Sequence, residues 1–198
     1  MSTMGKRILI IQGHPDGAHR HLCHALAAAY ADGARAAGHS VETVDAGRLH
    51  FPLVSDPRRW LDDPAPEALQ PAQQAIAHAE HIVLVFPLWL GDMPAQLKGF
   101  LEQVLRPGFA LARAPANPMR AGLLGGRSAR IVVTMGMPAS FYRWFYRAHG
   151  LRLLRRNILA FVGIRPVAAT VVGEAGAMPT DRVARWCARL SRLGARAA

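Results

Sequence analysis

Short runs of β-branched and aliphatic residues recur along the chain, with few polar residues inside them. They predict buried strands at Arg7–Ile11, His81–Phe86, Arg130–Thr134 and Val167–Val172. A fifth run, Ser40–Val44, has a weaker strand pattern. Between the runs, apolar residues return at helical spacing, as in Leu22–Tyr30 and Leu97–Leu105. This alternation predicts an α/β fold, a parallel sheet with helices on both faces.

The length of the chain sets the number of domains. Its 198 residues, 51% of them hydrophobic, can bury a substantial core, so we expect a single domain over residues 1–198. Five strands joined by helices are compatible with the order 2-1-3-4-5, although the pattern alone leaves the order open. Gly47–Pro66, the longest irregular stretch, is expected to be an ordered excursion. Ligands of such sheets bind beyond the carboxyl ends of the strands, so the loops after Ile11, Phe86 and Thr134 should carry the function.

The formal net charge of +11 changes this picture little. Much of it comes from arginines that recur every three or four residues near the end of the chain, opposite an apolar stripe: Arg182, Arg185, Arg189, Arg192 and Arg196. This spacing predicts an amphipathic helix with a solvated basic face. An anion-binding surface is the alternative, but we expect no nucleic-acid partner.

Cysteine usage and hydropathy indicate the compartment. Cys23 and Cys187 are far apart and belong to no C-x-x-C pair, which favours a reducing environment. The apolar run Ile8–Ile11 is too short for a signal peptide, and no stretch approaches the roughly 20 apolar residues of a membrane span. We therefore expect a soluble, cytoplasmic protein without a membrane span.

The loop after the first predicted strand, Gln12–His21, leads into a helix. It contains neither G-x-G-x-x-G nor G-x-x-x-x-G-K-[ST]. The free N–H groups of a helix N-terminus attract an anion, and basic side chains surround this one, which suits a phosphate monoester: His14, His19, Arg20 and His21. Metal ligation by these histidines with His24, Asp16 and Cys23 is one alternative, but no pair has the i, i+4 spacing of a zinc helix, and we expect no metal. The other alternative is that these histidines flank the start of the helix and bind no ligand.

The loop after Phe86 is too apolar for an ordinary surface loop. It ends at Pro94, which suits the first turn of the next helix. A flat, partly apolar ligand lying against Pro87, Leu88 and Trp89 would explain its composition. The alternative is that Trp89 packs against its own domain or a second subunit.

This stretch also carries a family resemblance. The pattern P-L-W-x-G-x-M-P-A-x-L-K-x-F (Pro87–Phe100), followed by Arg106–Ala110, resembles the signature of flavodoxin-like NAD(P)H:quinone oxidoreductases. That family includes the modulator-of-drug-activity proteins and the ancillary oxidoreductases of potassium-efflux systems. Gly13–Asp16 and Thr134–Gly136 match it too, and the resemblance spans nearly the whole chain.

The resemblance implies a flavodoxin-like fold with strand order 2-1-3-4-5 and a homodimer with its active sites at the subunit interface. It also implies an NAD(P)H-dependent oxidoreductase that transfers a hydride through bound FMN, or alternatively FAD, to a quinone or similar small acceptor. A flavin-binding regulatory subunit that docks on a partner such as a transport system is the alternative function.

The resemblance also assigns roles to residues. The phosphate would lie at the first loop, the edge of the flavin ring on the second, and its pyrimidine side near the third. The cofactor-binding residues carried over are His14, Ala18, His19, Arg20, His21, Pro87, Leu88, Trp89, Leu90, Thr134, Met135, Gly136 and Met137. Many family members have a trio such as Ser-Phe-Asn where this chain has His19–His21, so basic side chains and backbone would hold the phosphate here.

Aromatic residues dominate the segment Ser140–Gly150 after the third loop. They cannot all face one core, so some must line a cleft or an interface. The resemblance implies Tyr142 and His149 as catalytic residues, with Tyr146 as the alternative to Tyr142. A hydrophobic dimer helix with a terminal histidine is also compatible with this pattern. The arginines that follow the aromatic residues would meet an NADP phosphate or form a solvated helix face, and the sequence does not separate NADH from NADPH: Arg143, Arg147, Arg152, Arg155 and Arg156.

Overall fold

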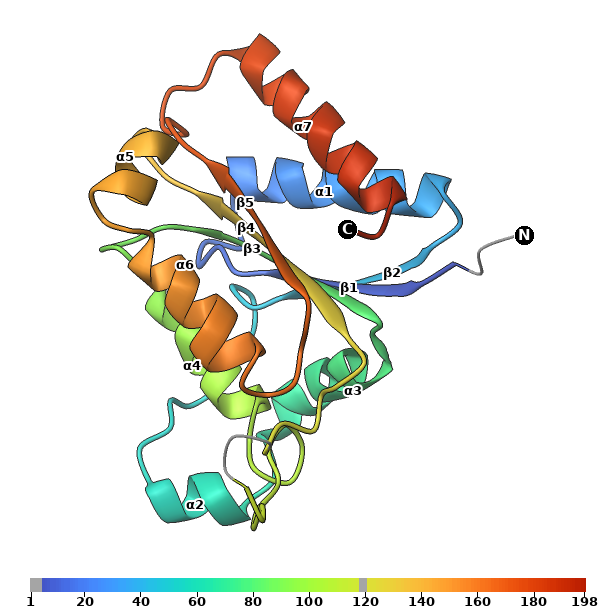
Figure 1. Cartoon of the computed structure of the whole chain (residues 1–198), viewed down its shortest axis with the longest axis vertical. Helices are drawn as coiled ribbons and strands as arrows, with labels where there is room; N and C mark the ends of the chain where they lie inside the picture. Colours follow the sequence, from blue (N-terminus) through green and yellow to red (C-terminus); the bar gives the residue numbers. More distant parts are fainter. Residues whose placement is uncertain (1–4, 118–120) are drawn as a thin grey trace.

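A five-stranded parallel sheet forms the middle layer of the molecule (Figure 1). The computed structural model describes residues 5–117 and 121–198. The strands are β1 (Arg7–Gln12), β2 (Ser40–Asp45), β3 (His81–Pro87), β4 (Ser128–Thr134) and β5 (Val167–Val172). They lie in the order β2-β1-β3-β4-β5, and every neighbouring pair is parallel. The predicted fold class and strand order are therefore confirmed.

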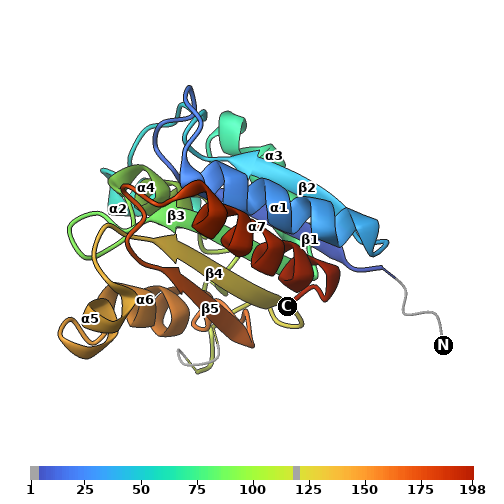
Figure 2. The ribbon, with the colours of Figure 1, turned by 90° about the horizontal axis from the view of Figure 1, so that it is seen from above.

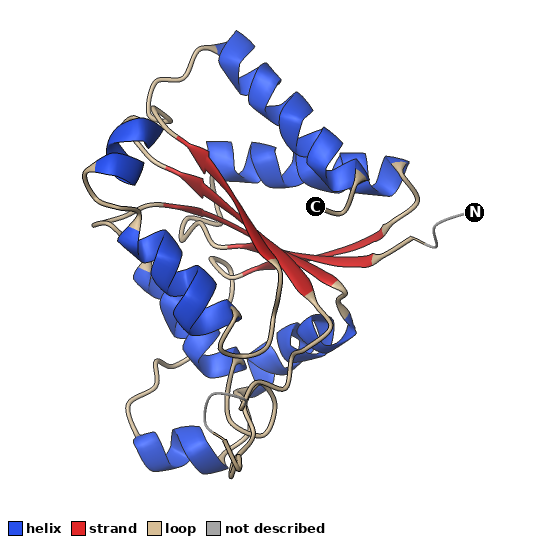
Figure 3. Cartoon of the chain, in the orientation of Figure 1, coloured by secondary structure: helices blue, strands red, loops and turns tan. Residues whose placement is uncertain are grey.

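Helices cover both faces of the sheet (Figure 3). On one face lie α1 (Leu22–Ala36) and α7 (Thr180–Ala195), which run side by side in Figure 2. On the other face lie α3 (Gln70–His78), α4 (Ala95–Val104) and α6 (His149–Leu153), which continues into the π-helical segment η3 (Leu154–Leu159). The shorter elements are α2 (Pro57–Asp62), the 3₁₀ turn η1 (Glu67–Leu69) and α5 (Ala139–Trp144).

The continuous hydrophobic runs follow from this layering. Successive side chains of a strand point to opposite faces of the sheet. In β1, Ile8 and Ile10 pack in the core under α1 and α7, whereas Leu9 and Ile11 pack in the core under α3 and α4. The edge strand β2 has no fully buried residue, which explains its weaker pattern.

The excursion 47–66 is tied to the end of α4. The indole Nε1 of Trp60 donates to the carbonyl oxygen of Glu102 at 2.9 Å, and Arg106 Nη1 donates to the carbonyl oxygens of Arg59 and Asp63 at 2.9 and 3.1 Å. The segment is therefore an ordered part of the fold, as expected. Pro94 stands immediately before α4, one residue ahead of the first turn where the sequence placed it.

The helix α7, the two cysteines and the hydropathy of the helices were also subjects of prediction. The helix α7 buries Leu190 and leaves Arg185, Arg189 and Arg192 exposed, as its spacing predicts. Cys23 and Cys187 are free thiols. Within residues 5–117 and 121–198, no helix is long and apolar enough to cross a membrane.

Candidate functional site

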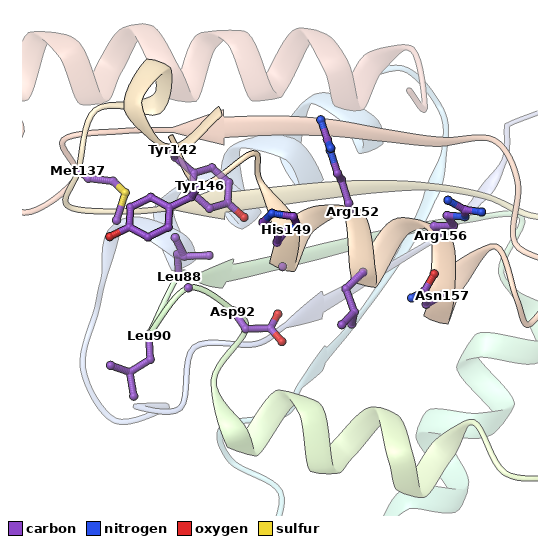
Figure 4. Close-up of a pocket in the computed structure, with 13 residues that line it drawn as sticks. Leu88, Leu90, Asp92, Met137, Tyr142, Tyr146, His149, Arg152, Arg156 and Asn157 are labelled. Carbon is purple, nitrogen blue, oxygen red and sulfur yellow. The ribbon is translucent and has the colours of Figure 1, made fainter. Parts of the chain in front are cut away.

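A cavity of about 860 Å³ opens where β3 and β4 end. It is lined by the loop after β3 and by the segment from α5 to η3 (Figure 4): Leu88, Leu90, Gly91, Asp92, Met137, Tyr142, Tyr146, His149, Gly150, Arg152, Leu153, Arg156 and Asn157. Its size is that of a small-molecule site, roughly 300–1,000 Å³. It lies beyond the carboxyl ends of the strands, where open α/β sheets bind their ligands.

The loop after β3 closes into a tight turn. Trp89 and Asp92 exchange backbone hydrogen bonds of 2.9 and 3.0 Å, and Leu90 and Gly91 between them have φ values of 48° and 86°. Two successive positive φ angles are typical of a two-residue hairpin turn. The N–H groups of Leu90 and Gly91 have no hydrogen-bond partner in the described part of the chain. The N–H of Leu88, in contrast, donates to the carbonyl oxygen of Thr134 at 2.7 Å and joins the second loop to the third.

Tyr142 and His149, the two predicted catalytic residues, both line the cavity. Tyr142 is 1% exposed, and its hydroxyl oxygen accepts a hydrogen bond from the N–H of Leu151 at 3.2 Å. The hydroxyl hydrogen is therefore left to donate to another group. Burial raises the pKa of the Tyr142 phenol, so this residue stays protonated at neutral pH. His149 begins α6 on the cavity wall and is exposed.

In the first loop, four donors converge on the carboxylate of Asp16. The backbone N–H groups of Ala18 and His19 donate to it at 2.9 and 3.1 Å. The ring nitrogens His21 Nε2 and His19 Nδ1 lie 2.8 and 2.9 Å from its other oxygen. The bonds from His21 and His19 hold the pKa of Asp16 well below its usual range. These donors, which were predicted to hold a phosphate, are therefore bonded to Asp16 instead.

Other groups of the first loop remain free. The N–H groups of Leu22 and Cys23, in the first turn of α1, have no partner in the hydrogen bonds of the described residues. The side chain of Arg20 is exposed and forms no ion pair with a described residue. The ring of His14 stacks on His21 with centroids 3.8 Å apart, and burial and the neighbouring histidines lower its pKa. These groups fit a phosphate held by the N-terminus of α1 and Arg20, beside Asp16.

The predicted cofactor residues fall into two clusters. Leu88, Leu90 and Met137 line the cavity, and Pro87 and Gly136 lie at the strand ends beside it. His14, Ala18, His19, Arg20 and His21 form the first loop and do not line the cavity. Trp89 lies between the clusters, half exposed, with its ring edge-on to His14 at 6.1 Å.

Two predicted residues can meet a ligand only through their backbone. The side chains of Thr134 and Met135 are buried, and the Thr134 hydroxyl lies 3.2 Å from the thiol of Cys23. Burial raises the pKa of this thiol to about 11. Cys23 is therefore an unreactive core residue. Over the described ranges, no group of three or more His, Cys, Asp or Glu side chains is arranged to hold a metal ion.

The cavity also contains residues that the sequence did not assign. Asp92 belongs to the turn of the second loop, and Leu153 and Asn157 follow on the helix after His149. A Cβ built on Gly150 would overlap the carbonyl oxygen of Gly91, so glycine lets the two cavity walls meet. No spacing in the sequence signals this contact, because it joins two loops that are distant in the chain.

Comparisons with known proteins add to this geometry. The model of a family described by its flavodoxin-like fold matches residues 6–193. An uncharacterized NAD(P)H oxidoreductase from Haemophilus influenzae is 33% identical over 110 residues, which are 55% of this chain and 54% of that protein. An FMN-dependent NADH:quinone oxidoreductase from Ruegeria pomeroyi is 26% identical over 111 residues, 50% of this chain and 52% of that protein. The matches thus span about half the length of these two relatives.

A solved structure resembles the chain over nearly its full length. It is the NAD(P)H:quinone oxidoreductase from Methanothermobacter marburgensis, which superposes with a TM-score of 0.81 at 21% identity. The superposition covers 97% of this chain and 96% of that one. At this level of identity the likeness concerns the fold.

Proposed function

The chain belongs to the family with the flavodoxin-like fold, and on this premise we propose that it is an NAD(P)H-dependent oxidoreductase. As a single flavin-binding domain, it would pass a hydride through bound FMN to a quinone or similar small acceptor. The observation that carries this proposal is the cavity beyond β3 and β4, which combines the apolar side chains of Leu88 and Met137 with Tyr142 and His149. The names of the oxidoreductases to which the chain is similar support the same activity.

FMN would be held at both ends by groups that the fold leaves free. The N–H groups of Leu22 and Cys23 and the guanidinium of Arg20 suit its phosphate. The loops Pro87–Leu90 and Gly136–Met137 suit its ring. Bound there, FMN supplies the two-electron chemistry that no side chain of this protein can supply. FAD is the alternative cofactor.

The side chains around the cavity have roles that their chemistry defines. Tyr142 remains protonated and can donate a hydrogen bond to negative charge that develops during reduction. His149, on the same wall, has ring nitrogens that can donate or accept a hydrogen bond. The free N–H groups of Leu90 and Gly91 are further donors, and Tyr146 offers an aromatic wall against which a flat substrate can stack.

We also propose that the protein works as a cytoplasmic homodimer. Aromatic side chains at the end of α5 and just after it are exposed in the single chain, among them Trp144 at 81%, Phe145 at 61% and Tyr146 at 44%. Leu90, at the tip of the turn, is fully exposed. Exposed apolar side chains of this number favour a protein partner, and a second copy packed on them would lie beside the cavity. The two free thiols fit a reducing compartment.

The test is the visible spectrum of the purified protein after FMN is added and unbound flavin is removed, followed by NAD(P)H:quinone turnover. We expect retained flavin absorbance and turnover. We expect Tyr142→Phe to lower turnover by about tenfold or more with flavin still bound, because it removes the hydrogen-bond donor to the developing negative charge. Tyr146→Phe, which removes an exposed hydroxyl from the same cavity, tests the alternative assignment: a larger loss of turnover than in Tyr142→Phe would transfer the role to Tyr146. Absence of both flavin and turnover would refute the proposal, and flavin without turnover would favour a regulatory subunit.

A further inference from the structure

A second cavity of about 810 Å³ adjoins the first along α6 and η3. It is lined by Arg152, Arg155, Arg156, Ala160, Arg165, Pro166 and Val167. Arg152 and Arg156 line both cavities, so the two share a wall. Figure 4 shows Arg152, Arg156 and Asn157 following one another along the helix beyond His149. The cationic side chains therefore gather around one hollow that continues the candidate active site.

The positive charge of this cavity is not balanced by carboxylates. Between Glu102 and Glu174 the chain contains no aspartate or glutamate. None of the four arginines forms an ion pair with a described residue, and the one side-chain hydrogen bond among them joins Arg165 to the carbonyl oxygen of Ala160 at 3.3 Å. On α7, by contrast, Arg182 pairs with Glu174 at 2.8 Å. Free guanidinium groups around a hollow favour an anion with several oxygens.

The position of the arginines relative to His149 favours an anion whose charge lies far from its reactive end. Arg156 follows His149 by seven residues on the continuous helical segment of α6 and η3, so it lies about two turns beyond His149 along the axis. A nicotinamide dinucleotide carries its charge at a distance from its reactive ring: two phosphates in the middle and, in NADPH, a third on the adenosine ribose. With the reactive ring beside Tyr142 and His149, the phosphates extend along the helix toward the arginines.

We propose that the second cavity binds the 2′-phosphate of NADPH through Arg155 and Arg165, with Arg152 and Arg156 on the pyrophosphate. The protein then prefers NADPH to NADH. This rests on the proposed function, because it requires the hydride donor to enter the first cavity. A solvated helix face, the alternative that the sequence left open, accounts for the exposure of the arginines but not for their convergence with Arg165 from a separate segment.

The test is calorimetric titration of the FMN-treated protein with adenosine 2′,5′-bisphosphate and with adenosine 5′-monophosphate. We expect the bisphosphate to bind at least about tenfold more tightly, since it gains charge-assisted hydrogen bonds. The double variant Arg155→Ala/Arg165→Ala should abolish this difference and lower kcat/KM for NADPH while leaving that for NADH unchanged. Arg192→Ala/Arg196→Ala, which removes two exposed arginines at the end of the chain, is the matched control and should change neither the affinity difference nor the preference for NADPH.

Equal affinity of the unaltered protein for the two nucleotides would overturn the assignment, even if the protein binds flavin and reduces quinones. So would an effect of Arg192→Ala/Arg196→Ala as large as that of Arg155→Ala/Arg165→Ala, because the preference would then reflect overall charge. Failure of the proposed function is read separately, from the absence of flavin absorbance. The titration needs no turnover and remains informative in that case.

Discussion

At the scale of single residues, Asp16 sets the chemistry of the first loop. Its carboxylate occupies the N–H groups of Ala18 and His19 and the rings of His19 and His21. A phosphate at the N-terminus of α1 would lie beside a second negative charge. The loop therefore has the donors for an anion and also a competitor for them.

Replacing Asp16 by asparagine should strengthen FMN binding. The amide oxygen of the new side chain can still accept from the N–H groups of Ala18 and His19, so the turn is kept, while the negative charge is lost. We expect the dissociation constant of FMN to fall by about fivefold at low salt, and by less at high salt, where charge repulsion is screened. Quenching of flavin fluorescence measures this affinity.

Riboflavin, which lacks the phosphate, is the control ligand for this variant. Its affinity should be the same for Asp16→Asn and the unaltered protein, because only the phosphate meets the charge of Asp16. Weaker FMN binding by the variant would mean that Asp16 orients the two histidines for the ligand and does not compete with it.

The sequence could predict some site residues and not others. The family motifs identify residues by their place after a strand. Leu88, Met137 and Tyr142 were assigned in this way, and all three line the cavity. It does not show which way each side chain turns, and Thr134 proves to point into the core toward Cys23. The capture of donors by Asp16 depends on the conformation of the loop, which no spacing encodes.

At the scale of elements, hydrophobic patterning located the strands but missed polar residues at their ends. The strand β4 begins at Ser128, two residues before the predicted start, because Ser128 and Ala129 continue the ladder with β3. The Ser128 hydroxyl bonds His81 Nδ1 at 2.8 Å, a polar pairing that is invisible to a hydrophobic pattern. The pattern likewise predicted α7 as an amphipathic helix but not its partner, α1.

The contact between α1 and α7 depends on small residues on each helix. A Cβ built on Gly194 would overlap the carbonyl oxygen of Tyr30, and one built on Gly33 would overlap that of Ser191. We expect Gly194→Ala to lower the free energy of unfolding by about 1–3 kcal/mol, because backbone must move apart. Alanine is a better helix former than glycine, so without the close contact the same change would raise the free energy of unfolding. The sign of the measured change therefore tests the contact.

Urea unfolding followed by circular dichroism measures this loss of stability. Gly176→Ala is the control, because no atom lies within 4 Å of its added Cβ. Equal stability of the Gly194 variant and the unaltered protein would mean that α7 can shift along α1 without loss, and that the close approach is not required.

At the scale of the whole molecule, the exposed apolar surface is concentrated beside the functional site. Phe141, Trp144, Phe145 and Tyr146 lie on or just after α5, and the rings of Phe141, Phe145 and Tyr146 contact one another, with Phe141 and Phe145 stacked at 5.0 Å. The rings contact one another within the chain, but each side chain remains exposed to solvent. The same segment supplies Tyr142 and His149 to the cavity. Assembly and catalysis are therefore expected to be coupled in this protein.

Trp144→Glu tests this coupling. Trp144 is 81% exposed in the single chain, so the change should leave the stability of the protomer nearly unaltered while placing a charge in the proposed interface. We expect the unaltered protein to sediment at twice the chain mass of 21.5 kDa and the variant to sediment at that mass, with reduced quinone turnover. Leu53→Glu, at a 64% exposed position on the 47–66 excursion, should remain dimeric and active. A monomeric unaltered protein with full turnover would show that one chain forms the complete site, and the aromatic cluster would then need another partner.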